Sequence, residues 1–322
     1  MKACVYDRYG SPDVLELKEV GVPVPGDDEV LVQVGAASIQ PYDWHFMRGL
    51  PLFVRLINGL RRPKKATIVG SDVAGTVASV GRNVARFRPG DEVFGEVNTG
   101  GCAEYISVHE DKLASKPVNL TFGQAAAVPL AAMTALQALR DSGEVGPGRR
   151  VLINGASGGV GTFAVQIAKS LGAEVTGVCS ARNVDMVRSL GADHVVDYGE
   201  RDFARGADRY DVIVDNMDRS LSDLRRALTP RGTVVLVGGS NGRWINGLGR
   251  VLKARLLAPL VRQNLRPCQE KATKEDLAVL KELIEAGKVK PVIDRTFTLS
   301  ETPEAMRYLE TGRARGKVVV TV

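Results

Sequence analysis

The chain has 322 residues, of which 44% are hydrophobic and 25% charged, a composition typical of a globular protein with about two domains. Aromatic residues make up only 5%, which argues against a surface that stacks sugars or single-stranded nucleic acid. The net charge of +6 is spread along the chain without a basic tail, so no nucleic-acid partner is expected.

The cysteines and the apolar runs bear on location. Cys4, Cys102, Cys179 and Cys268 are far apart and form no CxxC motif, so we expect reduced, mostly buried thiols. The first ten residues, MKACVYDRYG, lack the apolar core of a signal peptide. No run reaches the ~18 apolar residues of a transmembrane helix. We therefore expect a cytoplasmic protein with no membrane partner.

The first 120 residues are predicted to form short strands. Val-rich segments alternate with turns that contain Gly, Pro and Asp, which is typical of an antiparallel, barrel-like β domain. The predicted strands span residues 2–7, 15–20, 29–39, 72–81, 91–97 and 103–109. A helix is expected from Thr121, because Thr121 and Gln124 have the spacing of a capping box, and Pro129 marks a break or kink in it.

From Val151 the pattern changes to uniformly apolar strands separated by amphipathic helices. This alternation predicts a doubly wound parallel sheet that helices cover on both faces. Strands are expected at residues 151–156, 174–180, 194–198, 210–216 and 232–239, with helices at 159–172, 183–191 and 220–229. After about residue 250 we expect helices at 274–289 and 301–312 and strands at 294–299 and 316–322.

A glycine-rich loop joins the first of these apolar strands to its helix. Its glycines have the spacing GxxGxxG, which is weak evidence alone but stronger between a strand and a helix. Gly155 or Ala156 permits a tight turn, Gly158 lets backbone approach a pyrophosphate, and Gly161 lets the helix pack close to the sheet. The predicted cofactor contacts are Ala156, Ser157, Gly158, Gly159, Val160 and Gly161. A turn that holds no ligand is the alternative.

The end of the second apolar strand bears on the choice of nucleotide. An NAD site needs an acid here, whereas no Asp or Glu occurs between Glu174 and Asp185. Ser180 and Arg182 instead suit a 2′-phosphate, so the predicted cofactor is NADP(H); the alternative is that Arg182 is only a solvated residue. Ligands bind at the carboxyl ends of such strands, which adds Asn216, Gly238, Gly239 and Ser240 as predicted cofactor contacts.

Several linked motifs resemble the medium-chain dehydrogenase/reductase superfamily, and in particular its zinc-free, zeta-crystallin-like quinone oxidoreductase group. They lie at residues 70–81, 86–95, 101–108, 156–180 and 315–322, and the likeness covers essentially the whole chain. The resemblance implies an α/β fold with a GroES-like β-barrel domain at 1–122 and 260–322 and a Rossmann domain at 123–259. It also implies an active site in the cleft between the domains and a homodimer.

The resemblance further assigns residues. The family segment against the nicotinamide corresponds to Gln40, Pro41, Tyr42 and Asp43, which gives Gln40, Tyr42 and Asp43 as candidate catalytic residues, or else only a turn that ends the strand. Gln40 would donate to the substrate oxygen, Tyr42 would donate a proton or merely pack, and Asp43 would orient its neighbours. Thr134 and Tyr198 resemble positions near the cofactor, with a core role and a strand-end role as the alternatives. Lys317, near the C-terminus, is expected to approach the nicotinamide side or else to lie on the surface.

The positions of the zinc ligands in zinc-dependent relatives hold other residues here. Gln40 stands where those relatives have Cys, and Ser71 and Asp72 replace His-Glu. The three histidines, His45, His109 and His194, are scattered, so no metal site is predicted. Without a Lewis acid, hydride transfer needs an acceptor that is already electron-poor, such as a quinone or an α,β-unsaturated carbonyl.

The segment from Phe46 to Asp72 is longer and more basic than the corresponding loop of many quinone reductases. Apolar residues recur in it at helical spacing, namely Leu50, Leu52, Phe53, Leu56 and Ile57. We expect a short amphipathic lid that favours a bulky hydrophobic acceptor, with basic residues that can meet an anionic one. Two other functions stay open: an NADP-dependent alcohol/aldehyde oxidoreductase, and a nucleotide-gated RNA-binding or structural protein.

Overall fold

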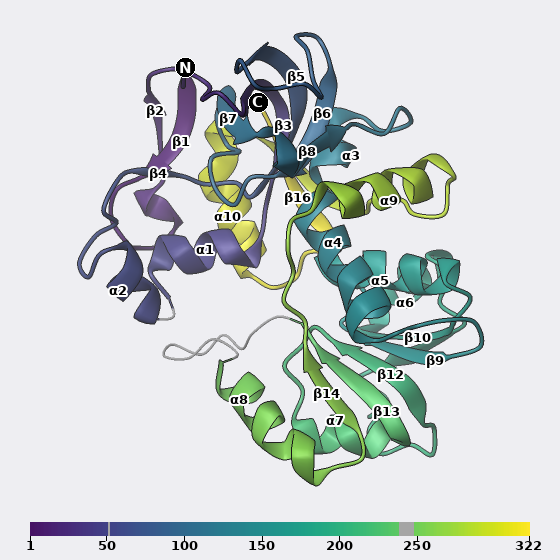
Figure 1. Cartoon of the computed structure of the whole chain (residues 1–322). Coiled ribbons are helices and arrows are strands. Elements are labelled where there is room, and N and C mark those ends of the chain that lie inside the picture. Colours follow the sequence, from purple (N-terminus) through teal and green to yellow (C-terminus); the bar gives the residue numbers. More distant parts are fainter. Residues whose placement is uncertain (51, 238–247) are drawn as a thin grey trace. The chain divides into compact units, whose positions relative to one another are not determined.

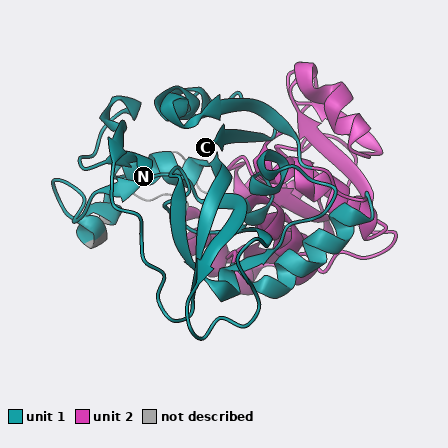
Figure 2. Cartoon of the chain, turned by 90° about the horizontal axis from the view of Figure 1, so that it is seen from above, with its two compact units in different colours: residues 1–130, 272–287, 291–322 teal, residues 131–271, 288–290 magenta. Residues whose placement is uncertain are grey.

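A computed structural model describes residues 1–50, 52–237 and 248–322 of the protein. These residues form two compact units (Figure 2): unit 1 comprises 1–130, 272–287 and 291–322, and unit 2 comprises 131–271 and 288–290. The mixed α/β fold, with one unit built on antiparallel strands and one on a doubly wound parallel sheet, agrees with the sequence-based prediction.

Unit 1 is built around the long strand β3, which pairs antiparallel with β5, β7 and β16. Its sheet has the order β15-β16-β3-β5-β6-β8, and a small second sheet has the order β2-β1-β4. Val30, Val32 and Val34 alternate along β3 and bury their side chains in the core, as a half-exposed strand requires. The strands are β1 Lys2–Tyr6, β2 Glu16–Glu19, β3 Glu29–Ile39, β4 Thr67–Ile68, β5 Asp72–Val80, β6 Glu92–Glu96, β7 Tyr105–His109, β8 Leu113–Ser115, β15 Ile293–Thr298 and β16 Lys317–Thr321.

The helices of unit 1 are α1 Pro41–Arg48, α2 Phe53–Asn58, α3 Phe122–Ala126, α9 Lys274–Glu285 and α10 Thr302–Glu310. The predicted capping box is present at α3, where Thr121 accepts a hydrogen bond from the backbone N–H of Gln124 and the Gln124 side chain accepts one from that of Thr121. The chain then breaks, as predicted, and α4 (Pro129–Gln137) begins at Pro129.

Unit 2 contains a parallel sheet with the order β11-β10-β9-β12-β13-β14. In Figure 1, α5 and α6 lie on one face of this sheet and α7 and α8 on the other, which is the doubly wound arrangement. The elements are β9 Arg150–Asn154, α5 Gly159–Ser170, β10 Glu174–Cys179, α6 Val184–Ser189, β11 His194–Asp197, β12 Tyr210–Asp215, α7 Leu221–Ala227, β13 Leu228–Leu236, α8 Leu248–Leu257 and β14 Asn264–Pro267.

Several elements differ from the sequence-based expectations, among them the short strands β4 and β8, which were not predicted. Helix α1 follows β3 directly, where the sequence indicated either a cleft-lining segment or a turn; its three aromatic residues and Pro41 hide the helical pattern. Helix α8 and strand β14 were not predicted. The short β14 ends in Pro267, which a strand tolerates at the edge of a sheet, and there it pairs only with β13.

The units divide at 130/131 and 271/272, whereas the sequence-based boundaries fall at 122/123 and 259/260. The reason at the first boundary is that α3 packs against β3 and β5 of unit 1. At the second, β14 extends the parallel sheet of unit 2 through Pro267.

The cysteine prediction is confirmed: all four thiols are free, and Cys4, Cys102 and Cys179 are buried. Within the described ranges, none of the helices combines the length and apolar character needed to cross a bilayer.

Candidate active site

In the glycine loop between β9 and α5, backbone conformation requires glycine at one position and close packing requires it at a second. A third glycine has open space beside it. Gly155 has a φ of 79°, a left-handed conformation that glycine adopts readily. A Cβ at Gly161 would lie 2.1 Å from the Gly155 carbonyl oxygen. A Cβ at Gly158, in contrast, would meet only that oxygen within the described part of the chain, at 3.5 Å. The described protein therefore gives no packing reason for a glycine at position 158.

This open space lies at the N-terminus of α5. Gly158 is the N-cap residue and has no side chain that can cap the helix. The first N–H groups of a helix have no partner within it, and the helix dipole favours negative charge there. The geometry is that of an anion cradle, with room for a pyrophosphate above Gly158.

The loop follows β9. The strand order of the sheet reverses at β9, because β10 pairs with one edge of this strand and β12 with the other. At the carboxyl ends of β9 and β12, the Asn154 side-chain amide donates to Asp215 Oδ1 at 2.5 Å. The next residue, Asn216, donates its side-chain N–H to the Asn154 carbonyl oxygen. Its own Oδ1 is buried without a hydrogen-bond partner among the described residues. This edge therefore holds a buried acceptor that has no partner among the described residues.

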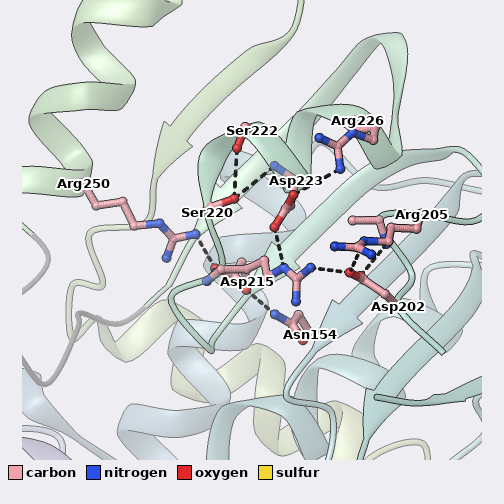
Figure 3. A network of polar contacts seen from close by, with 11 residues as sticks. Asn154, Asp202, Arg205, Asp215, Ser220, Ser222, Asp223, Arg226 and Arg250 are labelled. Atoms are coloured by element: carbon pink, nitrogen blue, oxygen red, sulfur yellow. Dashed lines mark hydrogen bonds and ion pairs between the residues drawn. The ribbon is translucent and has the colours of Figure 1, made fainter. Parts of the chain in front are cut away.

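Asp215 is the centre of a polar network that the sequence analysis did not predict (Figure 3). It is fully buried, and beyond Asn154 it accepts hydrogen bonds from the backbone N–H of Arg219 and from the Arg250 guanidinium of α8. The Arg219 side chain contacts Asp202 at 2.7 Å and Asp223 at 2.9 Å. These contacts fix the loop after β12, which carries Asn216.

The end of β10 contains the residues predicted to recognise a 2′-phosphate. Ser180 follows the strand, and Arg182 is exposed within the short turn of helix that begins after it. The buried Asn183 donates to Ser157 Oγ at 3.0 Å and to Ser180 Oγ at 3.2 Å, which joins the glycine loop to the end of β10. Tyr198 is 64% exposed, and its backbone N–H donates to the Cys179 carbonyl oxygen.

The remaining predicted cofactor residues fall in different places. Thr134 is buried on α4 in unit 2, and the thiol of Cys268 donates to its carbonyl oxygen. Gly238, Gly239 and Ser240 lie outside the described residues. Lys317 belongs to unit 1 and is only 4% exposed, which rules out the alternative surface role.

The chemistry at the carboxyl edge of the sheet in unit 2 fits a dinucleotide. The space at Gly158 and the N-terminus of α5 suit a pyrophosphate, and the Asn216 oxygen can accept a hydrogen bond. Arg182 and Tyr198 add an exposed cation and an exposed ring near the end of β10.

Unit 1 contains a second buried polar centre, around Asp72. The sheet register places Ser38 of β3 opposite Asp72 of β5, and Val318, which follows Lys317, opposite Ile39. Asp72 Oδ2 accepts hydrogen bonds from Gln40 Nε2 at 2.7 Å and from Ser38 Oγ at 2.9 Å, and Lys317 Nζ lies 3.5 Å away. The other oxygen, Oδ1, accepts the backbone N–H of Leu130 at 3.0 Å. Burial raises the pKa of Asp72 and lowers that of Lys317.

Asp43 is a buried hydrogen-bond acceptor at the start of α1. It is 3% exposed, and its carboxylate accepts the backbone N–H groups of Gln40 and Gly70 and the hydroxyl of Ser71. These bonds attach the start of α1 to the segment before β5. Burial raises the pKa of Asp43 to about 6 despite these three donors.

Tyr42 is the exposed member of the predicted catalytic set. Its ring is 39% exposed and lies 4.3 Å from that of Phe46, measured between centroids. Burial, with the nearby acids Asp43 and Glu96, raises the pKa of the Tyr42 phenol, which therefore stays protonated at neutral pH. The structure thus groups Gln40, Tyr42, Asp43 and Lys317 in unit 1, and adds Asp72, which was not predicted as a site residue.

The histidines and cysteines do not converge. Across the described residues, no group of three or more His, Cys, Asp or Glu side chains is arranged to hold a metal ion. His45 stacks on Trp44, His109 caps the turn after β7, and His194 contacts Glu174 at 3.1 Å.

Comparison with known proteins identifies the family. The family described as "Alcohol dehydrogenase GroES-like domain" matches residues 26–124, and that described as "Zinc-binding dehydrogenase" matches 190–320. The 2-methylene-furan-3-one reductase of Solanum lycopersicum is 36% identical over 99% of this chain and 79% of its own. The chloroplastic NADPH-dependent alkenal/one oxidoreductase of Arabidopsis thaliana is 35% identical, with the same two coverages. The solved quinone oxidoreductase of Coxiella burnetii has a TM-score of 0.87 and 32% identity, over 100% of this chain and 99% of its own.

The chain belongs to the medium-chain dehydrogenase/reductase superfamily, within its quinone oxidoreductase group. It is an NAD(P)H-dependent oxidoreductase, as the sequence analysis predicted.

Proposed function

We propose that this protein transfers hydride from NADPH to a quinone or an α,β-unsaturated carbonyl compound, without zinc. The observation that carries the proposal is the open cradle at Gly158 in a chain that aligns over its length with quinone and alkenal/one oxidoreductases. NADPH supplies the hydride when bound, so the protein must supply binding, orientation and hydrogen bonds.

The residues of unit 2 are proposed to hold the cofactor. The pyrophosphate binds at the start of α5, where Gly158 leaves room and the N–H groups face an anion. Ser180 and Arg182 bind the 2′-phosphate, because no acid that would repel it occurs between the end of β10 and Asp185. Asn183 holds Ser157 and Ser180 together and so positions both.

The residues of unit 1 are proposed to act on the acceptor oxygen. Reduction of a quinone or an enone places negative charge on that oxygen, which a hydrogen-bond donor stabilises. Tyr42 offers a protonated phenol, and the Gln40 amide keeps a second N–H group after one has bonded Asp72. Asp72 sets the orientation of this amide because a carboxylate accepts only from its nitrogen, and Lys317 compensates the charge of Asp72.

A panel of acceptors tests the proposal. Oxidation of NADPH and of NADH is followed with a benzoquinone, a naphthoquinone, an enone and a plain aldehyde, with and without EDTA. The proposal expects turnover of the quinone or enone, preference for NADPH and no effect of EDTA. Turnover confined to the aldehyde, or loss of turnover with EDTA, would favour the alcohol/aldehyde oxidoreductase instead.

Binding without turnover would favour the third alternative. If NADPH binds but no acceptor is reduced, RNA binding is measured at several salt concentrations, because a protein–RNA affinity falls steeply with ionic strength.

The homodimer and the cytoplasmic location also stay proposals. Light scattering after size exclusion tests the homodimer, which is the first of the two. Curated relatives include mitochondrial and chloroplastic proteins, so fractionation of the native cell tests the second.

A further inference from the structure

A pocket of about 730 Å³ opens in unit 1 beside Tyr42. Aromatic residues and lysines line it, whereas the polar centre described above is built around the carboxylate of Asp72. Its volume is within the range of small-molecule sites, roughly 300–1,000 Å³. Its lining includes three tyrosine rings, one phenylalanine ring and two lysines. The lining residues used below are Tyr9, Tyr42, Phe46, Asn58, Lys64 and Lys65.

The aromatic wall is fixed before any ligand binds. The Tyr9 hydroxyl donates to the Gly59 carbonyl oxygen at 2.9 Å, and the Arg55 guanidinium lies over the ring, 4.8 Å from its centroid. A Cβ at Gly49 would lie 2.8 Å from this ring, so Gly49, with a φ of 61°, packs directly against Tyr9. Tyr42 and Phe46 are held one helical turn apart on α1.

The charges of the segment from Arg55 to Lys65 divide into two kinds. Arg55 is used within the protein, because its Nε and one terminal nitrogen donate to the carbonyl oxygens of Gly49 and Arg48. Lys64 and Lys65 are exposed, and neither forms an ion pair with a described residue. None of the described residues that line the pocket carries a carboxylate. The two lysines are therefore exposed cations that line an aromatic pocket and have no ion-pair partner among the described residues.

We propose that this pocket binds an acceptor with an aromatic or conjugated body and an anionic substituent, a carboxylate or a sulfonate, which Lys64 and Lys65 contact. The flat body packs against Tyr9, Tyr42 and Phe46, and the Asn58 amide offers a further polar contact. This inference rests on the proposed function, since it names the class of acceptor that the same protein reduces. It explains why a basic segment lies next to Tyr42.

The test compares two acceptors in three proteins. A naphthoquinone and its sulfonated form are reduced by the wild type, by Lys64→Gln/Lys65→Gln and by the matched control Arg61→Gln/Arg62→Gln, at one ionic strength. The control removes the same charge from the same segment, at two exposed residues that do not line the pocket. The lysine variant should lose about three- to tenfold in kcat/KM for the sulfonated quinone, through KM, since exposed ion pairs are individually weak. The neutral quinone should change by less than about twofold in all three proteins.

Two results would overturn the inference: an equal loss in the lysine and arginine variants, or an equal change for both quinones. Calorimetric titration of the sulfonated quinone into each protein needs no turnover and should give the same ratio of Kd values. If the wild type binds but reduces neither quinone, the proposed function fails while the pocket is still tested. If it reduces the neutral quinone but the lysine variant behaves as wild type, only the inference fails.

Discussion

Substitution of Gly158 by Ala should separate cofactor binding from folding. The backbone at Gly158 has φ −85° and ψ 179°, which alanine adopts without strain. Among the described residues, its Cβ would meet only the Gly155 carbonyl oxygen, at 3.5 Å, an ordinary contact. Since glycine is a better N-cap residue than alanine, the free energy of unfolding should fall by about 1 kcal/mol.

The cost should appear when NADPH binds. A methyl group at this position occupies the space through which a pyrophosphate would approach the N–H groups of α5. Loss of one hydrogen bond to a charged group costs about 1.5–3 kcal/mol, which corresponds to an increase in Kd of roughly tenfold to a hundredfold.

Gly161→Ala is the matched control. Here the added Cβ would lie 2.1 Å from the Gly155 oxygen and 2.8 Å from the backbone of Ala156, so the chain itself must move. Overpacking of this kind costs about 1–3 kcal/mol, and Tm should fall by several degrees. Thermal unfolding of the free proteins and fluorescence titration with NADPH measure the two effects. If the Gly158 variant binds NADPH as tightly as the wild type, or if Tm falls equally in both variants, Gly158 does not provide space for the pyrophosphate.

Three further predictions concern single side chains. Arg182→Ala should lower the ratio of kcat/KM for NADPH to that for NADH by about tenfold, with NADH little changed, because only NADPH carries the 2′-phosphate; an unchanged ratio would count against the assignment. Lys317→Met leaves the buried Asp72 without its counter-charge and should lower the free energy of unfolding in urea by about 3–5 kcal/mol, part of which a second substitution, Asp72→Asn, restores. The pKa of Asp43 is raised to about 6 from 3.8, so the folded state binds this proton more tightly than the unfolded state does. Stability should therefore fall as pH rises from about 4 to 6, and Asp43→Asn should remove up to about 3 kcal/mol of this dependence, measured by urea unfolding across that range.

The sequence predicted those features that depend on neighbours along the chain. Val-rich runs between turns placed β3 and β5, and the Thr121–Gln124 spacing placed the start of α3. The roles of Gly155 and Gly161 also followed, because a tight turn and a close helix leave the same pattern in any such loop.

The polar centre of unit 1 could not be predicted in the same way. Asp72 stands 32 residues from Gln40 and still farther from Lys317, and only the register of β3 with β5 and β16 brings the three together. The sequence analysis used Asp72 only as evidence against a zinc site, because Ser71 and Asp72 replace the His-Glu of zinc-dependent relatives. A charged residue at the start of an apolar strand signals a buried partner, but it does not say which one.

The same reasoning explains the residues of unit 2 that were missed. Asn183 was taken as part of a helix start, yet its side chain joins the two segments predicted to hold the pyrophosphate and the 2′-phosphate. Asp215 ends an apolar strand and is enclosed by Asn154, Arg219 and Arg250, so its charge is used within the protein and not on a ligand. Asn216, its neighbour, is the residue with a buried oxygen to spare. Residue type places both residues at the edge of the sheet where ligands bind. Only their hydrogen bonds show that Asp215 supports the site, whereas Asn216 keeps an acceptor oxygen without a described partner.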